Sequence, residues 1–299
     1  MHGHSHKAPA SSKTFAIGIG LNVLFVMVEV VYGLRSHSLA LLSDAGHNLG
    51  DVLGLGLSWG AIILAQQPPS DRHTYGMRRA SILASLGNAI LLLVAVGGIS
   101  WEALQRLVHP HAVEGGTVVV VAAIGIVVNG LAALLFMSGR HHDLNVRSAF
   151  LHMLSDAAVS VGVALAGIAI QLTGKSWVDP MVSLGVGAVI VLGTWSLLKE
   201  SLRLAMDAVP EGIDLPAIQD FLGQLPGVSA VHDLHVWAMS TTETALTVHV
   251  VVPDRVVNDN TIAQICRDLH DRFGIEHTTI QVERGDGTSE CGQAPAHVV

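Results

Sequence analysis

The stretch LALLSDAGHNLGDVLGLGL, residues 39–57, decides the class of fold. Apolar residues dominate it and continue to Ala65, yet its centre holds His47 and Asp51. A charged side chain at the middle of a bilayer costs roughly 2.5 kcal/mol or more. If this segment spans a membrane, the two polar residues need a partner that offsets their burial, and the rest of the chain has to provide it.

The composition is that of a membrane protein. Half of the 299 residues are hydrophobic and only 13% are charged, a combination outside the usual range of soluble domains. A helix needs about 20 apolar residues to cross a bilayer, and six runs are close to that length or longer: 15–34, 39–65, 82–107, 117–137, 148–172 and 180–198. We therefore predict a flexible tail over 1–14, six transmembrane helices within 15–206 and a separate domain over 207–299.

The basic residues predict the orientation. Nine Lys and Arg residues fall on the side of the membrane that includes both termini, and three fall on the other side. Because cytoplasmic loops carry the excess of Lys and Arg, both termini of this multi-pass protein are expected in the cytoplasm, with the chain in the cell membrane. The first apolar run follows a polar tail with His2, His4 and His6, which favours an uncleaved first helix and a tail able to catch metal transiently.

The region after residue 206 is predicted to form a small α+β domain. Helical spacing over 215–225 and 261–273 alternates with strand patterns over 230–239, 245–252 and 277–283, an order of ferredoxin-like type. Fourteen acidic residues against four Arg give this region a net charge of −10. Such a charge opposes binding of nucleic acid; it either attracts cations or serves solubility alone. The only cysteines, Cys266 and Cys291, do not form a disulfide framework, which suits a reducing compartment.

Two copies of one motif, HxxxD, provide the candidate metal ligands. His47 and Asp51 are four residues apart, and His152 and Asp156 in HMLSD repeat that spacing in the fifth span. Residues four apart share a helix face, and the two spans run in opposite directions. If the two helices touch, His47 lies level with Asp156, and Asp51 lies level with His152.

Two nitrogen and two oxygen ligands suit tetrahedral Zn²⁺. Two carboxylates and one Zn²⁺ sum to zero charge, and so do two carboxylates and two protonated histidines. Exchange of a metal ion for up to two protons would avoid a bare charge in the membrane. Asp44 shares this helix face and is either a gate or outer acceptor for the site or a partner of the helix dipole; Glu29, Asn22 and Asn129 are expected to hydrogen-bond between helices.

The chain resembles the cation diffusion facilitator family, and within it the bacterial zinc, cobalt and cadmium resistance exporters. The matching segments are 38–51, 73–79, 148–163, 177–180 and 231–252, in the family's order. The resemblance implies six transmembrane helices, a cytosolic ferredoxin-like domain, a homodimer and export of Zn²⁺ driven by inward proton flow. It maps the transport site onto four residues: His47, Asp51, His152 and Asp156. Histidine rather than aspartate at position 47 is similar to the zinc-selective form of the family, with less use of Cd²⁺.

The resemblance also suggests zinc sites in the cytosolic domain. They would involve His232 and His249, with Glu283 at the end of the last strand. Strand alternation adds His277 on the same face as Glu283, and it puts His235 on the opposite face from His232. Cys291 could reach such a site from the C-terminal segment.

Two other classes of function fit the sequence less well. A zinc metalloenzyme of the membrane needs an open coordination position and a general base, but the sequence has no HExxH motif and the paired motifs leave no spare base. A metal sensor with a membrane anchor would not need two buried HxxxD motifs. The sequence therefore predicts a proton-coupled Zn²⁺ exporter and not an enzyme.

Overall fold

The structure is a computed structural model that describes residues 12–137, 144–253, 258–285, 291 and 293. Residues 1–11, with the three tail histidines, and the loop 138–143 lie outside these described residues. The described chain divides into two compact units. The first comprises residues 1–56 and 87–196, and the second comprises residues 57–86 and 197–299.

The predicted membrane helices are present, with bounds close to the expected ones. They are α1 (Ser12–Arg35), α2 (Leu39–Ala65), α3 (Ala80–Val108), α4 (Gly115–Met137), α5 (Leu144–Thr173) and α6 (Val178–Ala205). Within the described residues, the five helices α2 to α6 are long and apolar enough to cross a membrane. The apolar α1, 24 residues long, completes the predicted set of six, so the expected fold class is confirmed.

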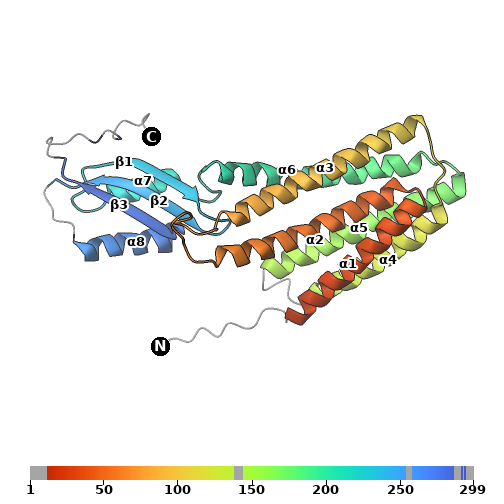
Figure 1. Ribbon diagram of the computed structural model, residues 1–299, viewed down its shortest axis with the longest axis horizontal. Coiled ribbons are helices and arrows are strands. Elements are labelled where there is room, and N and C mark those ends of the chain that lie inside the picture. The colour runs from red at the N-terminus through yellow and green to blue at the C-terminus, as the bar shows by residue number, and fades with distance from the viewer. Residues whose placement is uncertain (1–11, 138–143, 254–257, 286–290, 292, 294–299) are drawn as a thin grey trace. The chain divides into compact units, whose positions relative to one another are not determined.

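Glycines permit close helix packing in the first unit, where α1, α2, α4 and α5 form a bundle (Figure 1). A Cβ atom at Gly115 of α4 would lie 2.6 Å from the carbonyl oxygen of Gly167 in α5. A Cβ atom at Gly125 would lie 2.6 Å from Phe25 of α1 and 2.8 Å from the hydroxyl of Ser160 in α5. Because heavy atoms do not approach so closely, only glycine lets α4 lie against both of its neighbours.

The second unit contains the small α+β domain. It consists of α7 (Leu215–Gly223), β1 (Ala230–Ala238), β2 (Thr244–Val251), α8 (Asp259–Phe273) and β3 (His277–Glu283). The sheet order is β1-β2-β3, with β1 antiparallel and β3 parallel to β2. Leu246, Val248 and Val250 of β2 are buried together with residues of α7 and α8, so the helices cover one sheet face. The other face presents Thr247 and His249 of β2.

The ends of the two short helices follow their sequence signals. Asp214 caps α7 by accepting from the backbone N–H of Ala217, and Asn258 caps α8 by accepting from that of Thr261. Gly274 ends α8 at φ 67°, in the left-handed conformation that glycine adopts readily. These capping contacts explain why the starts of α7 and α8 and the end of α8 were predictable within a few residues.

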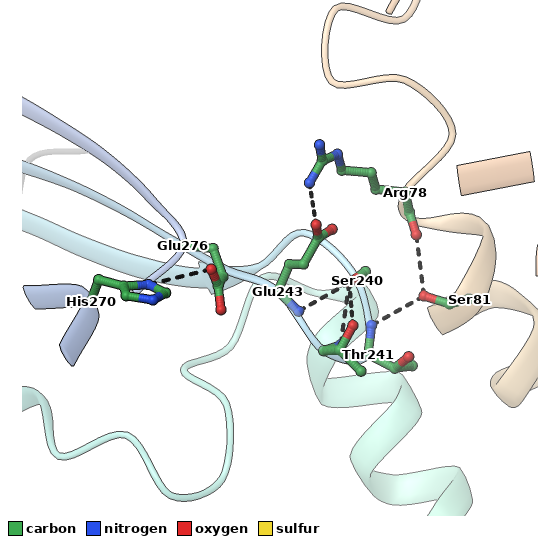
Figure 2. Close-up of polar contacts among 8 residues, drawn as sticks. Arg78, Ser81, Ser240, Thr241, Glu243, His270 and Glu276 are labelled. Atoms are coloured by element: carbon green, nitrogen blue, oxygen red, sulfur yellow. Dashed lines mark hydrogen bonds and ion pairs between the residues drawn. The ribbon is translucent and has the colours of Figure 1, made fainter. Parts of the chain in front are cut away.

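Polar contacts join the start of α3 to the turn between β1 and β2 within the second unit (Figure 2). Arg78 forms an ion pair with Glu243, and the backbone N–H of Thr241 donates to the hydroxyl of Ser81 over 3.1 Å. Ser240 accepts from the backbone N–H of Glu243 over 3.0 Å and so fixes the shape of the turn. The strand turn is therefore attached to the first residues of a membrane helix.

Candidate metal centre

The structure brings together the four membrane residues that the two HxxxD motifs predict. Nε2 of His47 lies 3.3 Å from Oδ1 of Asp156, and Nε2 of His152 lies 3.1 Å from Oδ2 of Asp51. Within each helix the same nitrogens lie 3.9 Å and 3.8 Å from the carboxylates of Asp51 and Asp156. Each histidine thus lies closer to the carboxylate of the opposite helix than to that of its own.

The nitrogen-to-oxygen distances are close to those around a tetrahedral ion. Four ligand atoms at 2.0–2.2 Å from Zn²⁺ stand about 3.3–3.6 Å from one another, and the four measured separations of 3.1–3.9 Å bracket that interval. Ligand atoms of His47, Asp51 and Asp156 all lie within 4.8 Å of one another, whereas His152 lies outside this closer group. We refer to His47, Asp51, His152 and Asp156 as the membrane quartet.

The quartet is buried on one side. The side chain of Asp156 is 1% exposed, whereas that of His152 is 41% exposed. Close packing of α3 against α2 beside Asp51 helps to fix the ligand face, because a Cβ atom at Gly50 would lie 2.0 Å from Leu92. A Cβ atom at Gly54 would similarly lie 2.8 Å from the amide nitrogen of Asn88.

Asp44 and Glu29 are both fully buried next to the quartet. Asp44 accepts from the Ser160 hydroxyl of α5 over 3.1 Å, so its side chain contacts another helix rather than the first turn of α2. Glu29 of α1 accepts from the side-chain amide of Asn48 in α2 over 3.0 Å, which is an interhelical hydrogen bond of the predicted kind. The sequence allowed two roles for Asp44, as a gate or outer acceptor of the metal site or as a partner of the helix dipole. The contact with Ser160 favours the first role.

Asp179 is a residue whose role the sequence did not reveal. It lies in the first turn of α6 and accepts from the backbone N–H groups of Leu39 and Ala40 over 2.6 Å and 3.3 Å. The Ser38 hydroxyl donates to the same carboxylate, which is fully buried. Free N–H groups at the start of a helix attract an anion. The Asp179 carboxylate of α6 is that anion for α2. The matching segment 177–180 contains Asp179, but nothing in the sequence indicated that its carboxylate would lie at the start of α2.

A second cluster lies on the sheet face that the helices leave uncovered. Oxygens of Glu283 lie 3.3 Å from Nε2 of His232 and 3.1 Å from Nδ1 of His249. Sγ of Cys291 lies 3.4 Å from Nδ1 of His249. Ligand atoms of these four residues lie within 4.8 Å of one another, and Nε2 of His232 is buried without a hydrogen bond in the described structure. Two imidazoles, a carboxylate and a thiolate are a ligand set that Zn²⁺ accepts.

A β-bulge changes the expected faces of β1. His232 pairs with His249 and His235 pairs with Thr247, with a register shift between them. Since directly paired residues lie on the same sheet face, His232 and His235 share one face, contrary to simple alternation. Asp233 in the bulge adopts φ 50°, and its carboxylate lies 2.8 Å from Nε2 of His235 and 3.5 Å from Nε2 of His249.

His277 lies apart from this cluster. It pairs with Ala245 at one end of β2, whereas Glu283 pairs with Val251 at the other end. Six residues of strand separate the two by roughly 20 Å. The ring of His277 instead contacts that of Tyr75, with 5.4 Å between centroids. The structure therefore brings His232, His249 and Glu283 together and leaves His277 out.

The surroundings of Glu283 favour its ionised form. Partial burial by itself opposes ionisation, but hydrogen bonds from Gln281 and Cys291 and the neighbouring His232 and His249 together lower the pKa of Glu283. The carboxylate is thus available as a ligand at neutral pH.

Comparison with known proteins identifies both parts of the chain. Residues 15–205 match the family model described as the cation efflux transmembrane domain. Residues 210–285 match the model described as the cation efflux protein, cytoplasmic domain. The two matches divide the chain at the end of α6, close to the boundary expected from hydropathy.

Relatives of similar length match almost the whole chain. The metal cation efflux system protein CzcD of Cupriavidus metallidurans is 38% identical over 297 residues, covering 98% of this chain and 92% of that protein. The zinc transporter ZitB of Escherichia coli is 37% identical, and the cadmium, cobalt and zinc/H⁺-K⁺ antiporter of Bacillus subtilis is 35% identical; each match covers 94% of this chain and 92% of the relative.

A solved structure of a related cytosolic domain matches the C-terminal part of the chain. It is the metal-bound C-terminal domain of the CzcD transporter from Cupriavidus metallidurans, at 40% identity and a TM-score of 0.22. The match covers 24% of this chain and 99% of that domain.

Proposed function

Because this chain belongs to the cation diffusion facilitator family of metal exporters, we propose that it exports Zn²⁺ from the cytoplasm in exchange for protons. The observation that carries the proposal is the membrane quartet, in which two helices each contribute one imidazole and one carboxylate at 3.1–3.9 Å. The relatives' names support zinc among the metals, since ZitB is named a zinc transporter.

Charge balance supports exchange with protons. The two carboxylates of the quartet neutralise one Zn²⁺, and two protonated histidines restore the same neutrality after the metal leaves. Imidazole titrates near pH 6.5 in water, so histidine is suited to take a proton on an acidic outer side. Neither state then places a net charge in the bilayer.

Alternating access would move this ligand face between the two sides of the membrane. The excess of basic residues in the loops on the side of both termini supports a cytoplasmic position for the termini and the α+β domain. Under this orientation the Leu39 end of α2 is its outer end. Zn²⁺ would enter from the cytoplasmic end, bind the quartet and leave toward Leu39.

The cytosolic cluster supports regulation by the same metal. His232, His249, Glu283 and Cys291 would hold a Zn²⁺ ion, which would draw this acidic domain together with its copy in a homodimer. The cytoplasmic domain that the chain carries implies dimerisation. Without metal, the net charge of −10 after residue 206 would keep the two copies apart. The relatives are transporters, and we assign no catalytic activity to this chain.

Removal of one quartet carboxylate tests the proposal. Asp51→Ala leaves a bound Zn²⁺ with a net positive charge and three ligands, so proton-dependent Zn²⁺ uptake into everted membrane vesicles is expected to fall to background. Glu102→Gln, which alters an acidic residue of α3 outside the quartet, is expected to keep uptake. Unchanged uptake by Asp51→Ala would remove the quartet from the transport path.

A further inference from the structure

A cavity of about 1020 Å³ lies within the second unit, where the α+β domain meets the start of the membrane helix α3. Most of its lining comes from the segment before α3, the segment after α6, and strand β1 with the residue that follows it. The contacts of Figure 2 attach the turn after β1 to the same part of α3. Neither the membrane quartet nor the cytosolic cluster lines this cavity. Its volume is at the upper end of that of sites for small ligands.

The charged part of the lining is basic. Arg72, Arg78 and Arg79 line the cavity, and Asp207 is the one acidic residue that does so among the described residues. Arg78 forms an ion pair with Glu243 and Arg79 with Asp207, and both guanidinium groups keep further N–H donors and remain partly exposed. Arg72 is exposed and has no ion-pair partner in the described part of the chain. Positive charge is thus concentrated at one cavity, although the chain after residue 206 has a net charge of −10.

The rest of the lining is largely apolar. Leu234 and Trp237 of β1 and Leu83 of α3 contribute to it. Leu83 is 61% exposed, and the exposed Ile90 and Val94 follow it after seven and eleven residues. Residues at this spacing share one face of a helix. An apolar strip therefore leads from the cavity along α3 into the length of that helix that crosses the membrane.

The arginines lie at the depth of the lipid headgroups. Arg79 precedes Ile82, where the apolar run of α3 begins, by three residues, or roughly 5 Å along a helix. The domain that completes the cavity matches a cytoplasmic domain, so the adjacent headgroups are those of the cytoplasmic leaflet. Anionic lipids give that leaflet its negative surface, and basic pockets at the cytoplasmic ends of membrane helices bind phosphate headgroups.

From this arrangement we propose that the cavity binds an anionic phospholipid of the cytoplasmic leaflet. The guanidinium groups hydrogen-bond the phosphate, for which arginine is well suited, and an acyl chain lies along the exposed face of α3 from Leu83. A soluble phosphate compound offers the same headgroup chemistry but leaves the apolar strip uncovered, so the strip favours a lipid. The bound lipid attaches the cytoplasmic domain and the segment before α3 to the same leaflet. This site does not depend on the proposed exchange of Zn²⁺ for protons.

Retention of lipid by the full-length protein tests the proposal. The protein is reconstituted into vesicles of equal parts phosphatidylglycerol, which is anionic, and phosphatidylcholine, which has no net charge, with the same acyl chains. It is then extracted in a neutral detergent, and the phospholipid that remains bound is identified and counted. We expect the wild type to retain phosphatidylglycerol in preference to phosphatidylcholine. Arg72→Ala should lower this retention about fivefold. Arg284→Ala, which removes an exposed arginine outside the cavity, is the control and should retain the lipid.

Two further variants test the two parts of the lipid separately. Leu83→Asn removes apolar contact with the acyl chain and should lower retention roughly threefold to tenfold. Arg72→Lys keeps the positive charge but loses the paired donors of the guanidinium group, so it should keep part of the retention. Both side chains are exposed, and the variants are therefore expected to fold.

Three results would overturn the proposal. Equal retention by the wild type and Arg72→Ala would mean that Arg72 does not hold the lipid. Equal retention of phosphatidylglycerol and phosphatidylcholine would mean that the cavity does not recognise an anionic headgroup. Displacement of the lipid by glycerol 3-phosphate, together with no effect of Leu83→Asn, would assign the cavity to a soluble phosphate compound. Because retention is measured without Zn²⁺ or a pH gradient, failure of the proposed transport function would leave its outcome unchanged.

Discussion

At the residue scale, each histidine of the quartet faces the carboxylate of the other helix. His47 lies 3.3 Å from Asp156, and His152 lies 3.1 Å from Asp51. Neither helix alone provides more than one nitrogen and one oxygen ligand. A relative movement of α2 and α5 would therefore change the two distances between the helices, so the proposed transport site could bind metal on one side and release it on the other.

His47 is expected to set metal preference. Imidazole binds Zn²⁺ through one directed nitrogen at about 2.0–2.1 Å, whereas a carboxylate can bind through one or two oxygens and accommodates larger ions. His47→Asp is expected to raise the ratio of Cd²⁺ to Zn²⁺ flux roughly tenfold, a change of about 1.4 kcal/mol in discrimination. Flux in vesicles with each metal measures this ratio. His109→Asp, at an exposed position after α3, is the control; an unchanged ratio in His47→Asp would contradict the assignment.

Glu283 is expected to make the cytosolic domain sensitive to acid. Its pKa is lower in the folded protein, so the stability it contributes is present above the ordinary carboxyl pKa of about 4.3 and is lost as pH falls through the folded pKa. Without metal, the free energy of unfolding of Glu283→Gln should therefore depend less on pH below about pH 5 than that of the wild type. Denaturation of residues 207–299 followed by Trp237, the only tryptophan there, measures it. Identical slopes in both proteins would contradict this prediction.

At the element scale, α2 is held at both its start and its ligand face. Asp179 of α6 accepts from the first N–H groups of α2, and the hydroxyl groups of Ser43 and Ser183 hydrogen-bond over 2.7 Å one turn further on. Near the quartet, α3 approaches at Gly50. These contacts attach α2 to α6 and α3, so these helices would have to move with α2 if the ligand face changes sides.

Gly50 should be intolerant of a side chain. In Gly50→Ala the new Cβ atom would lie 2.0 Å from Leu92, and overpacking typically costs about 1–3 kcal/mol. We expect a lower unfolding temperature and weaker Zn²⁺ flux. Gly130→Ala on α4, where nothing lies within 4 Å, should gain up to about 1 kcal/mol from helix propensity. Thermal unfolding of the purified proteins compares them, and equal behaviour of the two variants would exclude close α2–α3 packing.

The sequence predicted features that depend on local periodicity. Hydropathy located the spans, the i, i+4 spacing put His47 with Asp51 and His152 with Asp156, and capping residues located α7 and α8. It missed Asp179, because its partners are about 140 residues away. It misplaced His235, because the bulge at Asp233 breaks the alternation that the prediction assumed. Face alternation likewise grouped His277 with Glu283 but could not show that the length of β3 separates them.

At the scale of the whole molecule, charge is divided between the two parts of the chain. The region up to residue 206 has a net charge of +2 and the region after it −10. The membrane part has two acidic residues in the quartet, and Glu29, Asp44 and Asp179 are buried outside it. The acidic cytosolic part offers a separate cluster, His232, His249, Glu283 and Cys291. One metal could therefore be both the transported substrate and the signal that reports its own concentration.

Simultaneous measurement of Zn²⁺ and proton flux shows directly whether this protein exchanges Zn²⁺ for protons. Proteoliposomes with an acidic lumen and no K⁺ gradient should take up Zn²⁺ while the lumen becomes more alkaline, with up to about two protons leaving per Zn²⁺. A protonophore should stop both fluxes, and Asp51→Ala should show neither. Zn²⁺ uptake without any change in lumenal pH, or uptake driven only when a K⁺ gradient is imposed, would contradict exchange of Zn²⁺ for protons at the quartet.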